Sequence, residues 1–246
     1  MRSRLWEIDA LRGIAVVAMV LYHFSYDLAF FGLFDPGFFR SGFGLEAGRT
    51  IGTTFIFLAG LSLPLSYRRV SGGSGHKPFR KYLGRGLRIF AYGLVITFLT
   101  WIFVPDEMIL FGVLHLIGLS IIFAYPLLEF GLPNAVLGLG CLVAGAFLQN
   151  LGPGPPWLVW LGLRANFFML DYWPIFPWFG VVLLGVFVGN TLYGDRGKRT
   201  SHTTPPLLAI RPLTFLGRHS LPVYLVHQPI LLAALILLGI GNVPFG

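Results

Sequence analysis

Long apolar runs recur along the whole sequence and limit the fold more than any other feature. A helix needs about 20 consecutive apolar residues to cross the hydrocarbon core of a bilayer, because its backbone polar groups must be satisfied within the segment. Seven runs of about this length cover residues 10–31, 48–67, 86–104, 110–129, 133–150, 174–193 and 219–241. The run 133–150 is short and rich in glycine, which makes it the weakest of the set. We predict an all-α, polytopic membrane protein, a helical bundle of about seven transmembrane helices.

The composition agrees with lipid as the solvent. Charged residues make up 11% of the chain, against roughly 25% in a soluble globular domain. No long polar linker divides the sequence, so we expect a single integral-membrane domain over residues 1–246. The one cysteine, Cys141, excludes an internal disulfide. Glu7 and Asp9 interrupt the basic N-terminal segment and no small-residue cleavage site follows, so we interpret the first run as an uncleaved helix.

The lysines and arginines predict the orientation, because cytoplasmic loops carry an excess of them. With a cytoplasmic N-terminus, 15 fall on the inner side and 3 on the outer side. The outer three are Arg40, Arg49 and Arg164, and the inner ones are Arg2, Arg4, Arg12, Arg68, Arg69, Lys77, Arg80, Lys81, Arg85, Arg88, Arg196, Lys198, Arg199, Arg211 and Arg218. We therefore attribute the net charge of +8 to topology in a bacterial cytoplasmic (inner) membrane and not to nucleic-acid binding.

Two features near the outer interface fit this orientation. Aromatic side chains gather where a bilayer meets water, and we expect such a belt from Trp101, Trp157, Trp160, Trp173 and Trp178. The segment 31–47, rich in Phe and Gly, is expected to dip back into the membrane or to lie at its interface.

Ionisable side chains inside the apolar runs are the candidates for function. A charge at the bilayer centre costs roughly 2.5–3.5 kcal/mol on insertion scales, so such residues face the bundle interior and usually have a role. His23, His115 and His227 lie within the first, fourth and seventh runs, and Asp27 lies near the outer end of the first. We predict a polar chamber between these three helices. The alternative that His115 and His227 only hold helices together by hydrogen bonds stays open.

The first run places three of its polar residues on one helical face. His23 and Asp27 are four residues apart, so Asp27 is placed to orient the imidazole as the carboxylate of a catalytic triad does. Arg12 precedes His23 by eleven residues, which brings it to nearly the same face about 16 Å away along the axis. An anion held by Arg12 could thus extend a long arm to His23, and acyl-coenzyme A has that shape. Alternatively Arg12 pairs with Asp9, which is placed to be the N-cap of the first helix.

Several motifs together resemble those of membrane acyltransferases. They are Glu7-Ile8-Asp9-Ala10-Leu11-Arg12-Gly13, Leu21-Tyr22-His23-Phe24, Phe55-Ile56-Phe57-Leu58-Ala59-Gly60, Asp171-Tyr172-Trp173-Pro174-Ile175-Phe176-Pro177-Trp178, Phe215-Leu216-Gly217-Arg218-His219-Ser220 and Tyr224-Leu225-Val226-His227-Gln228-Pro229. The chain resembles the heparan-α-glucosaminide N-acetyltransferase catalytic-domain family and, more distantly, the acyltransferase type 3 family. The type 3 enzymes typically have about ten spans, whereas this chain has room for seven, which favours the heparan-type relatives.

The resemblance implies a transmembrane acyltransferase that moves an acyl group, most simply acetyl, from cytoplasmic acyl-CoA to an extracytoplasmic acceptor. The acceptor is expected to be a sugar, a glycan or another carbohydrate-like group, and no metal is expected. His23 would act as general base or transient acyl carrier, with Asp27, His115 and His227 as further catalytic candidates. Arg12, Arg85, Arg88 and Arg218 are the candidates for binding acyl-CoA. A homo-oligomer is left open.

Two other functional classes remain at this stage. Intramembrane His and Asp also serve as proton relays, so the chain could be a small proton-coupled transporter. No inverted repeat or matched pair of broken helices supports that alternative. The third hypothesis is a non-enzymatic subunit of an envelope assembly.

Overall fold

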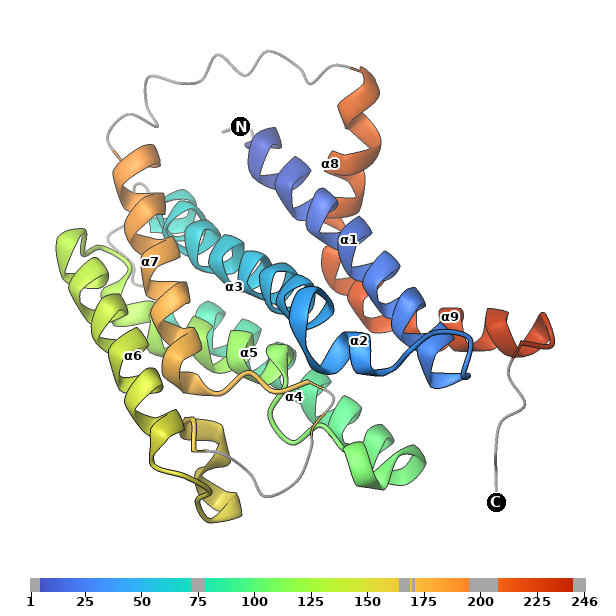
Figure 1. Ribbon diagram of the computed structural model, residues 1–246. Helices are drawn as coiled ribbons and strands as arrows, with labels where there is room; N and C mark the ends of the chain where they lie inside the picture. Colours follow the sequence, from blue (N-terminus) through green and yellow to red (C-terminus); the bar gives the residue numbers. More distant parts are fainter. Residues whose placement is uncertain (1–4, 72–77, 164–168, 170, 195–207, 241–246) are drawn as a thin grey trace. The chain divides into compact units, whose positions relative to one another are not determined.

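The computed structural model describes residues 5–71, 78–163, 169, 171–194 and 208–240, and the elements in these ranges are all helical (Figure 1). Six of the helices are long and apolar enough to cross a membrane, judged by length and composition. The prediction of an all-α polytopic membrane protein is confirmed. In chain order the elements are α1 (Trp6–Phe30), α2 (Gly37–Arg40), α3 (Gly42–Ser71), α4 (Phe79–Phe103), η1 (Pro105–Glu107), α5 (Val113–Phe123), η2 (Tyr125–Leu127), α6 (Leu132–Asn150), η3 (Pro156–Leu161), α7 (Ile175–Tyr193), η5 (Leu208–Ile210), α8 (Arg211–Arg218) and α9 (Ser220–Leu237).

The chain divides into two compact units. The first contains residues 1–55 and 201–246 and the second contains residues 56–200, with the boundary inside α3. Each unit is described by itself below. A single functional domain over 1–246 stays a prediction.

The helix predicted over 110–129 is much shorter than expected. α5 has 11 residues, which rise about 16 Å, roughly half the thickness of a bilayer core. It begins only after Gly112, and Pro126, which lacks the N–H for a continuing helix, stands in η2 directly behind it. By contrast, the weakest predicted run forms the complete 19-residue helix α6.

Within the second unit, α5 nevertheless returns the chain toward the start of α4. A Cβ added at Gly93 would lie 2.9 Å from the His115 ring, and one added at Gly86 would lie 2.6 Å from Ile122, so the two helices run antiparallel in close contact. The Tyr125 ring then packs 5.3 Å from that of Tyr82, near the start of α4. This is the direction that a seventh crossing requires, and the count of seven stays a prediction.

Helix α7 packs against α3 and α6 through glycines. A Cβ at Gly60 would lie 2.2 Å from the Val182 carbonyl oxygen, and one at Gly180 would lie 2.5 Å from that of Gly138. Small residues let membrane helices approach until their backbones touch, which gives close packing where lipid supplies no hydrophobic driving force.

The backbone between α5 and α6 has its carbonyl groups satisfied by two asparagines. The Asn134 amide donates to the carbonyls of Leu127 and Phe130, at 2.8 and 2.6 Å. The Asn190 amide donates to those of Leu128 and Phe130, at 2.9 and 2.8 Å. Non-helical backbone in a membrane protein needs such partners, because lipid offers none.

In the first unit, α1 crosses α8 at two glycines. A Cβ at Gly13 would lie 2.0 Å from the Leu213 carbonyl oxygen, and one at Gly217 would lie 1.7 Å from that of Asp9. The segment 31–47 holds a turn, α2 and the start of α3, with the buried Phe39 packed 5.4 Å from the Tyr22 ring. Whether this segment lies at the membrane interface stays a prediction.

The predicted tryptophan belt is only partly supported by exposure. Trp101 and Trp157 are 58% and 72% exposed, as residues facing an interface should be. Trp173 is 9% exposed, packs edge-on against Trp178 with ring centroids 4.4 Å apart, and donates its indole N–H to Asp171. Trp173 is therefore packed inside the second unit, and its place in an aromatic belt stays a prediction. The cytoplasmic N-terminus stays a prediction, since Arg2, Arg4, Lys77, Arg164, Arg196, Lys198 and Arg199 lie outside the described residues.

Candidate functional site

Two of the predicted histidines meet in the first unit. The rings of His23 in α1 and His227 in α9 are 4.9 Å apart between centroids, at an angle of 60°. His23 is half-buried and His227 is 8% exposed. Neither nitrogen of His23 hydrogen-bonds to another described residue, so the imidazole is available for chemistry.

The tautomer of His227 follows from its neighbour. Its Nδ1 lies 2.6 Å from the Tyr224 carbonyl oxygen, which can only accept, so Nδ1 carries the hydrogen. In the neutral ring, Nε2 then carries a lone pair. This Nε2 is buried and has no hydrogen-bond partner among the described residues. His227 thus presents an unpaired base within a membrane-spanning helix.

Asp27 does not orient His23 by a direct hydrogen bond, which corrects the predicted role. Its Oδ1 accepts a 2.5 Å hydrogen bond from the Gln228 side-chain amide, and its Oδ2 has no partner among the residues that the structure describes. Asp27 is 2% exposed. Gln228 of α9, and not His23, therefore holds the Asp27 carboxylate. An i,i+4 spacing places two residues on one helical face, but it does not bring their side chains into contact.

Gln228 is a site residue that the sequence analysis did not assign. It follows His227, so α9 presents an imidazole and an amide to the turn of α1 that carries His23 and Asp27. Its Oε1 is buried and has no partner among the described residues. The sequence does contain a signal for Gln228 as a site residue. It is a second polar side chain directly beside the intramembrane histidine, ahead of Pro229 in an apolar run.

At the other end of α1, Asp9 bridges two arginines. Arg12 approaches Asp9 Oδ1 at 3.4 Å and Arg218 approaches Oδ2 at 3.3 Å. The alternative pairing of Arg12 with Asp9 is therefore present. Asp9 is not the N-cap, since α1 begins at Trp6 with Leu5 as the capping residue. The two guanidinium groups and the one carboxylate together carry a net charge of +1.

His115 belongs to the second unit and has both ring nitrogens engaged. Its Nδ1 accepts from the Gly112 backbone N–H at 3.1 Å. Its Nε2 lies 3.3 Å from the Thr97 hydroxyl, which itself donates to the Ile109 carbonyl and so accepts from Nε2–H. This geometry favours the structural alternative for His115. The chamber predicted to join it to His23 and His227 stays a prediction.

The other two arginines predicted to bind acyl-CoA also lie in the second unit. Arg85 and Arg88 are exposed and stand one turn apart near the start of α4. Their role with acyl-CoA stays a prediction. No three His, Cys, Asp or Glu side chains gather closely enough to hold a metal ion within the ranges that the structure describes.

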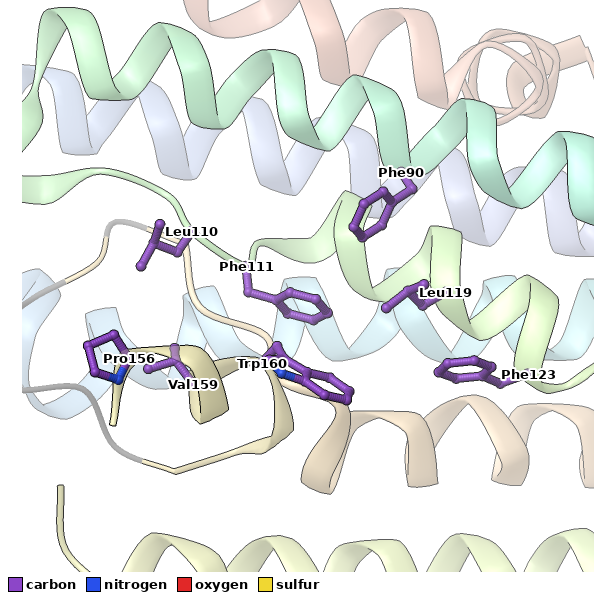
Figure 2. A pocket seen from close by; sticks show the side chains of 8 residues that line it. All are labelled: Phe90, Leu110, Phe111, Leu119, Phe123, Pro156, Val159 and Trp160. Atoms are coloured by element: carbon purple, nitrogen blue, oxygen red, sulfur yellow. The ribbon is translucent and has the colours of Figure 1, made fainter. Parts of the chain in front are cut away.

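The second unit also contains an apolar cavity of about 490 Å³ (Figure 2). Its walls come from α4, α5, the segment before α5 and η3, through Phe90, Leu110, Phe111, Leu119, Phe123, Pro156, Val159 and Trp160. Figure 2 shows the Phe111 and Trp160 rings on either side of the space. No titratable side chain lines it, so the cavity suits an apolar group and supplies no acid or base.

The comparisons with known proteins agree with the motifs of the sequence. No curated protein and no solved structure matches the chain. The family described as "Heparan-alpha-glucosaminide N-acetyltransferase, catalytic" matches residues 4–229, which include both histidines of the pair, Asp27 and the arginine cluster. This match covers more than half of the sequence and runs through both units. The chain therefore belongs to the heparan-alpha-glucosaminide N-acetyltransferase catalytic-domain family.

Proposed function

We propose that this membrane protein of an acetyltransferase family transfers an acetyl group from acyl-CoA to an acceptor, with His23 and His227 at the reacting centre. The observation that carries the proposal is the pair itself. His23 is half-buried with both nitrogens available, and its ring lies 4.9 Å from that of His227, whose Nε2 is an unpaired base. Such groups are costly in a membrane helix and are retained for function.

His23 acts as the general base. It accepts a proton from the acceptor hydroxyl or amine while the acceptor attacks the thioester carbonyl carbon. The new C–O or C–N bond forms, the C–S bond breaks, and protonated His23 returns the proton to the CoA thiolate. The neutral ring of His227, held in place by the bond from Nδ1 to the Tyr224 carbonyl, packs beside His23 and positions that imidazole. In the covalent variant of this mechanism, His23 first takes the acetyl group from the thioester and then passes it to the acceptor.

Acyl-CoA binds from the cytoplasmic side through the arginine cluster. Arg12 and Arg218 hold the phosphates, since these two guanidinium groups and the Asp9 carboxylate between them carry a net positive charge. Arg12 stands about 16 Å from His23 along α1, a span that the pantetheine arm bridges.

The acceptor is a sugar-like or glycan group that arrives from the extracytoplasmic side of a bacterial inner membrane. The name of the family refers to a glucosaminide, which supports a carbohydrate acceptor. The excess of Lys and Arg in the predicted inner loops supports the orientation.

The test uses purified protein in lipid nanodiscs with radiolabelled acetyl-CoA and glucosamine. The wild type should release CoA and form labelled product. His23→Ala should lose roughly 10²–10⁴-fold in rate, the usual contribution of a general base. Ser25→Ala is the matched control, because the Ser25 hydroxyl only bonds the Leu21 carbonyl of its own helix. Full activity of His23→Ala would remove His23 from the mechanism. Proton-driven solute uptake into vesicles without CoA release would favour a transporter.

A further inference from the structure

Unpaired acceptor atoms gather at one place in the first unit. Seven buried side-chain atoms of the described residues have no hydrogen-bond partner. Three of them belong to residues around the histidine pair: Asp27 Oδ2, Gln228 Oε1 and His227 Nε2. The residues form one group, because Gln228 bonds Asp27, follows His227 in α9 and faces the same turn of α1.

All three atoms call for a hydrogen-bond donor. A carboxylate oxygen, an amide oxygen and the unprotonated nitrogen of an imidazole are acceptors. Leaving a buried polar group without a partner is costly, so native proteins pair such groups with protein, water or ligand. Asp27 and His227 are 2% and 8% exposed, so bulk solvent does not supply the donors.

The charge of Asp27 narrows the choice of donor. The ion pairs among the described residues are Arg12–Asp9, Arg49–Glu46 and Arg218–Asp9, and none of them includes Asp27. A buried carboxylate needs a cationic partner or several hydrogen bonds. Within the described part of the chain, Gln228 supplies one hydrogen bond to Oδ1, and neither the charge of Asp27 nor its Oδ2 has a further partner.

We propose that Asp27, Gln228 and His227 form a subsite for the primary ammonium group of the acceptor. An ammonium group has three N–H donors and one positive charge. These match the three unpaired acceptors and the uncompensated carboxylate. Gln228 holds Oδ1 and so directs Oδ2 toward the ligand. Asp27 and Gln228 are thus specificity-determining residues. This inference rests on the proposed function only for the acetyl transfer that follows binding of the acceptor.

In that transfer, two protons leave the ammonium nitrogen. The ammonium nitrogen first loses a proton to His23 and becomes a nucleophilic amine. It attacks the thioester carbon, so the C–N bond forms and the C–S bond breaks. His23 passes the first proton to solvent, takes the second proton from nitrogen during the attack, and returns it to the CoA thiolate.

Equilibrium binding without acetyl-CoA tests the subsite directly. Radiolabelled glucosamine and glucose, which differ by an amine in place of a hydroxyl, are the probes, with wild type in nanodiscs. Glucosamine should bind roughly tenfold or more tightly than glucose, because hydrogen bonds between its ammonium group and the Asp27 carboxylate are stronger than those of a neutral hydroxyl. Asp27→Asn should weaken glucosamine binding at least tenfold, Gln228→Leu should weaken it less, and Asp27→Glu should restore part of it. Ser25→Ala should bind as wild type does.

Three results would overturn the subsite: equal binding of both sugars, no binding of glucosamine by wild type, or unchanged binding by folded Asp27→Asn. If Asp27→Asn does not fold, glucosamine binding by Gln228→Leu is the deciding measurement, and unchanged binding would overturn the subsite. Steady-state kinetics separate this role from an orienting one. A recognition role raises KM for glucosamine and leaves KM for acetyl-CoA unchanged, whereas orienting His23 would lower kcat alone. Binding of glucosamine through Asp27 without CoA release would refute the proposed function and leave the subsite standing.

Discussion

The crossing of α1 and α8 gives a sharp prediction for Gly217→Ala. An added Cβ would lie 1.7 Å from the Asp9 carbonyl oxygen and 3.0 Å from the Gly13 nitrogen, whereas ordinary contact begins at 3.4 Å. Both obstacles are backbone, so no side chain can rotate away. The helices must separate locally by roughly 1.7 Å, and overpacking of this kind costs about 1–3 kcal/mol or more.

The separation should also reach the arginine cluster. Arg218 follows Gly217 directly, and its Nε lies 3.3 Å from Asp9 Oδ2. A shift of this size lengthens the contact to roughly 5 Å, beyond hydrogen-bond reach. We therefore expect a lower melting temperature, by about 2–4 °C for each kcal/mol in a chain of 150–250 residues, together with a raised KM for acetyl-CoA.

Thermal unfolding in detergent, followed by size-exclusion chromatography, measures the loss. Gly140→Ala in α6 and Gly84→Ala in α4 are matched controls, since nothing lies within 4 Å of a Cβ at either position. These controls should be neutral or gain about 0.5–1 kcal/mol from the better helix former. A Gly217→Ala protein that melts with the wild type would refute the close crossing of α1 and α8.

Two further changes test other contacts. Thr97→Val leaves the His115 Nε2–H without an acceptor and should cost about 1–3 kcal/mol in thermal unfolding. Thr191→Val is the control, because it removes only an exposed hydrogen bond within α7 and should not lower stability in this way. Equal melting temperatures of the two variants would contradict the assigned tautomer of His115. Arg218→Ala should raise KM for acetyl-CoA roughly tenfold, because the hydrogen bond from Arg218 to a phosphate is charge-assisted. Arg49→Ala is the control and should leave KM unchanged, since the ion pair of Arg49 with Glu46 is exposed. An unchanged KM in Arg218→Ala would exclude Arg218 from binding acyl-CoA.

Hydropathy alone predicts most of the fold. The run 10–31 becomes α1 over Trp6–Phe30 and the run 174–193 becomes α7 over Ile175–Tyr193. The error over 110–129 has a clear cause. A hydropathy window averages Gly112 and Pro126 with their apolar neighbours, so it extends a helix past residues that end it.

The site is predicted less completely, because its partners come from distant parts of the chain. Helical spacing correctly places His23 and Asp27 on one face of α1. It cannot indicate that Asp27 bonds Gln228 or that His23 meets His227, since these contacts join α1 to α9 across about 200 residues. The Asp9–Arg12 pair, three residues apart, is the kind of contact that a sequence does predict.

The two asparagines beside η2 carry an evolutionary consequence. The side-chain amides of Asn134 and Asn190 donate to the carbonyls of Leu127, Leu128 and Phe130, which lie outside an α-helix after the break at Pro126. A relative that replaces this proline with a good helix former regains the hydrogen bonds inside a longer α5, and selection on both amides then relaxes. Among homologues, substitutions at these three positions should therefore be correlated, as a proline–asparagine–asparagine set that is kept or lost together.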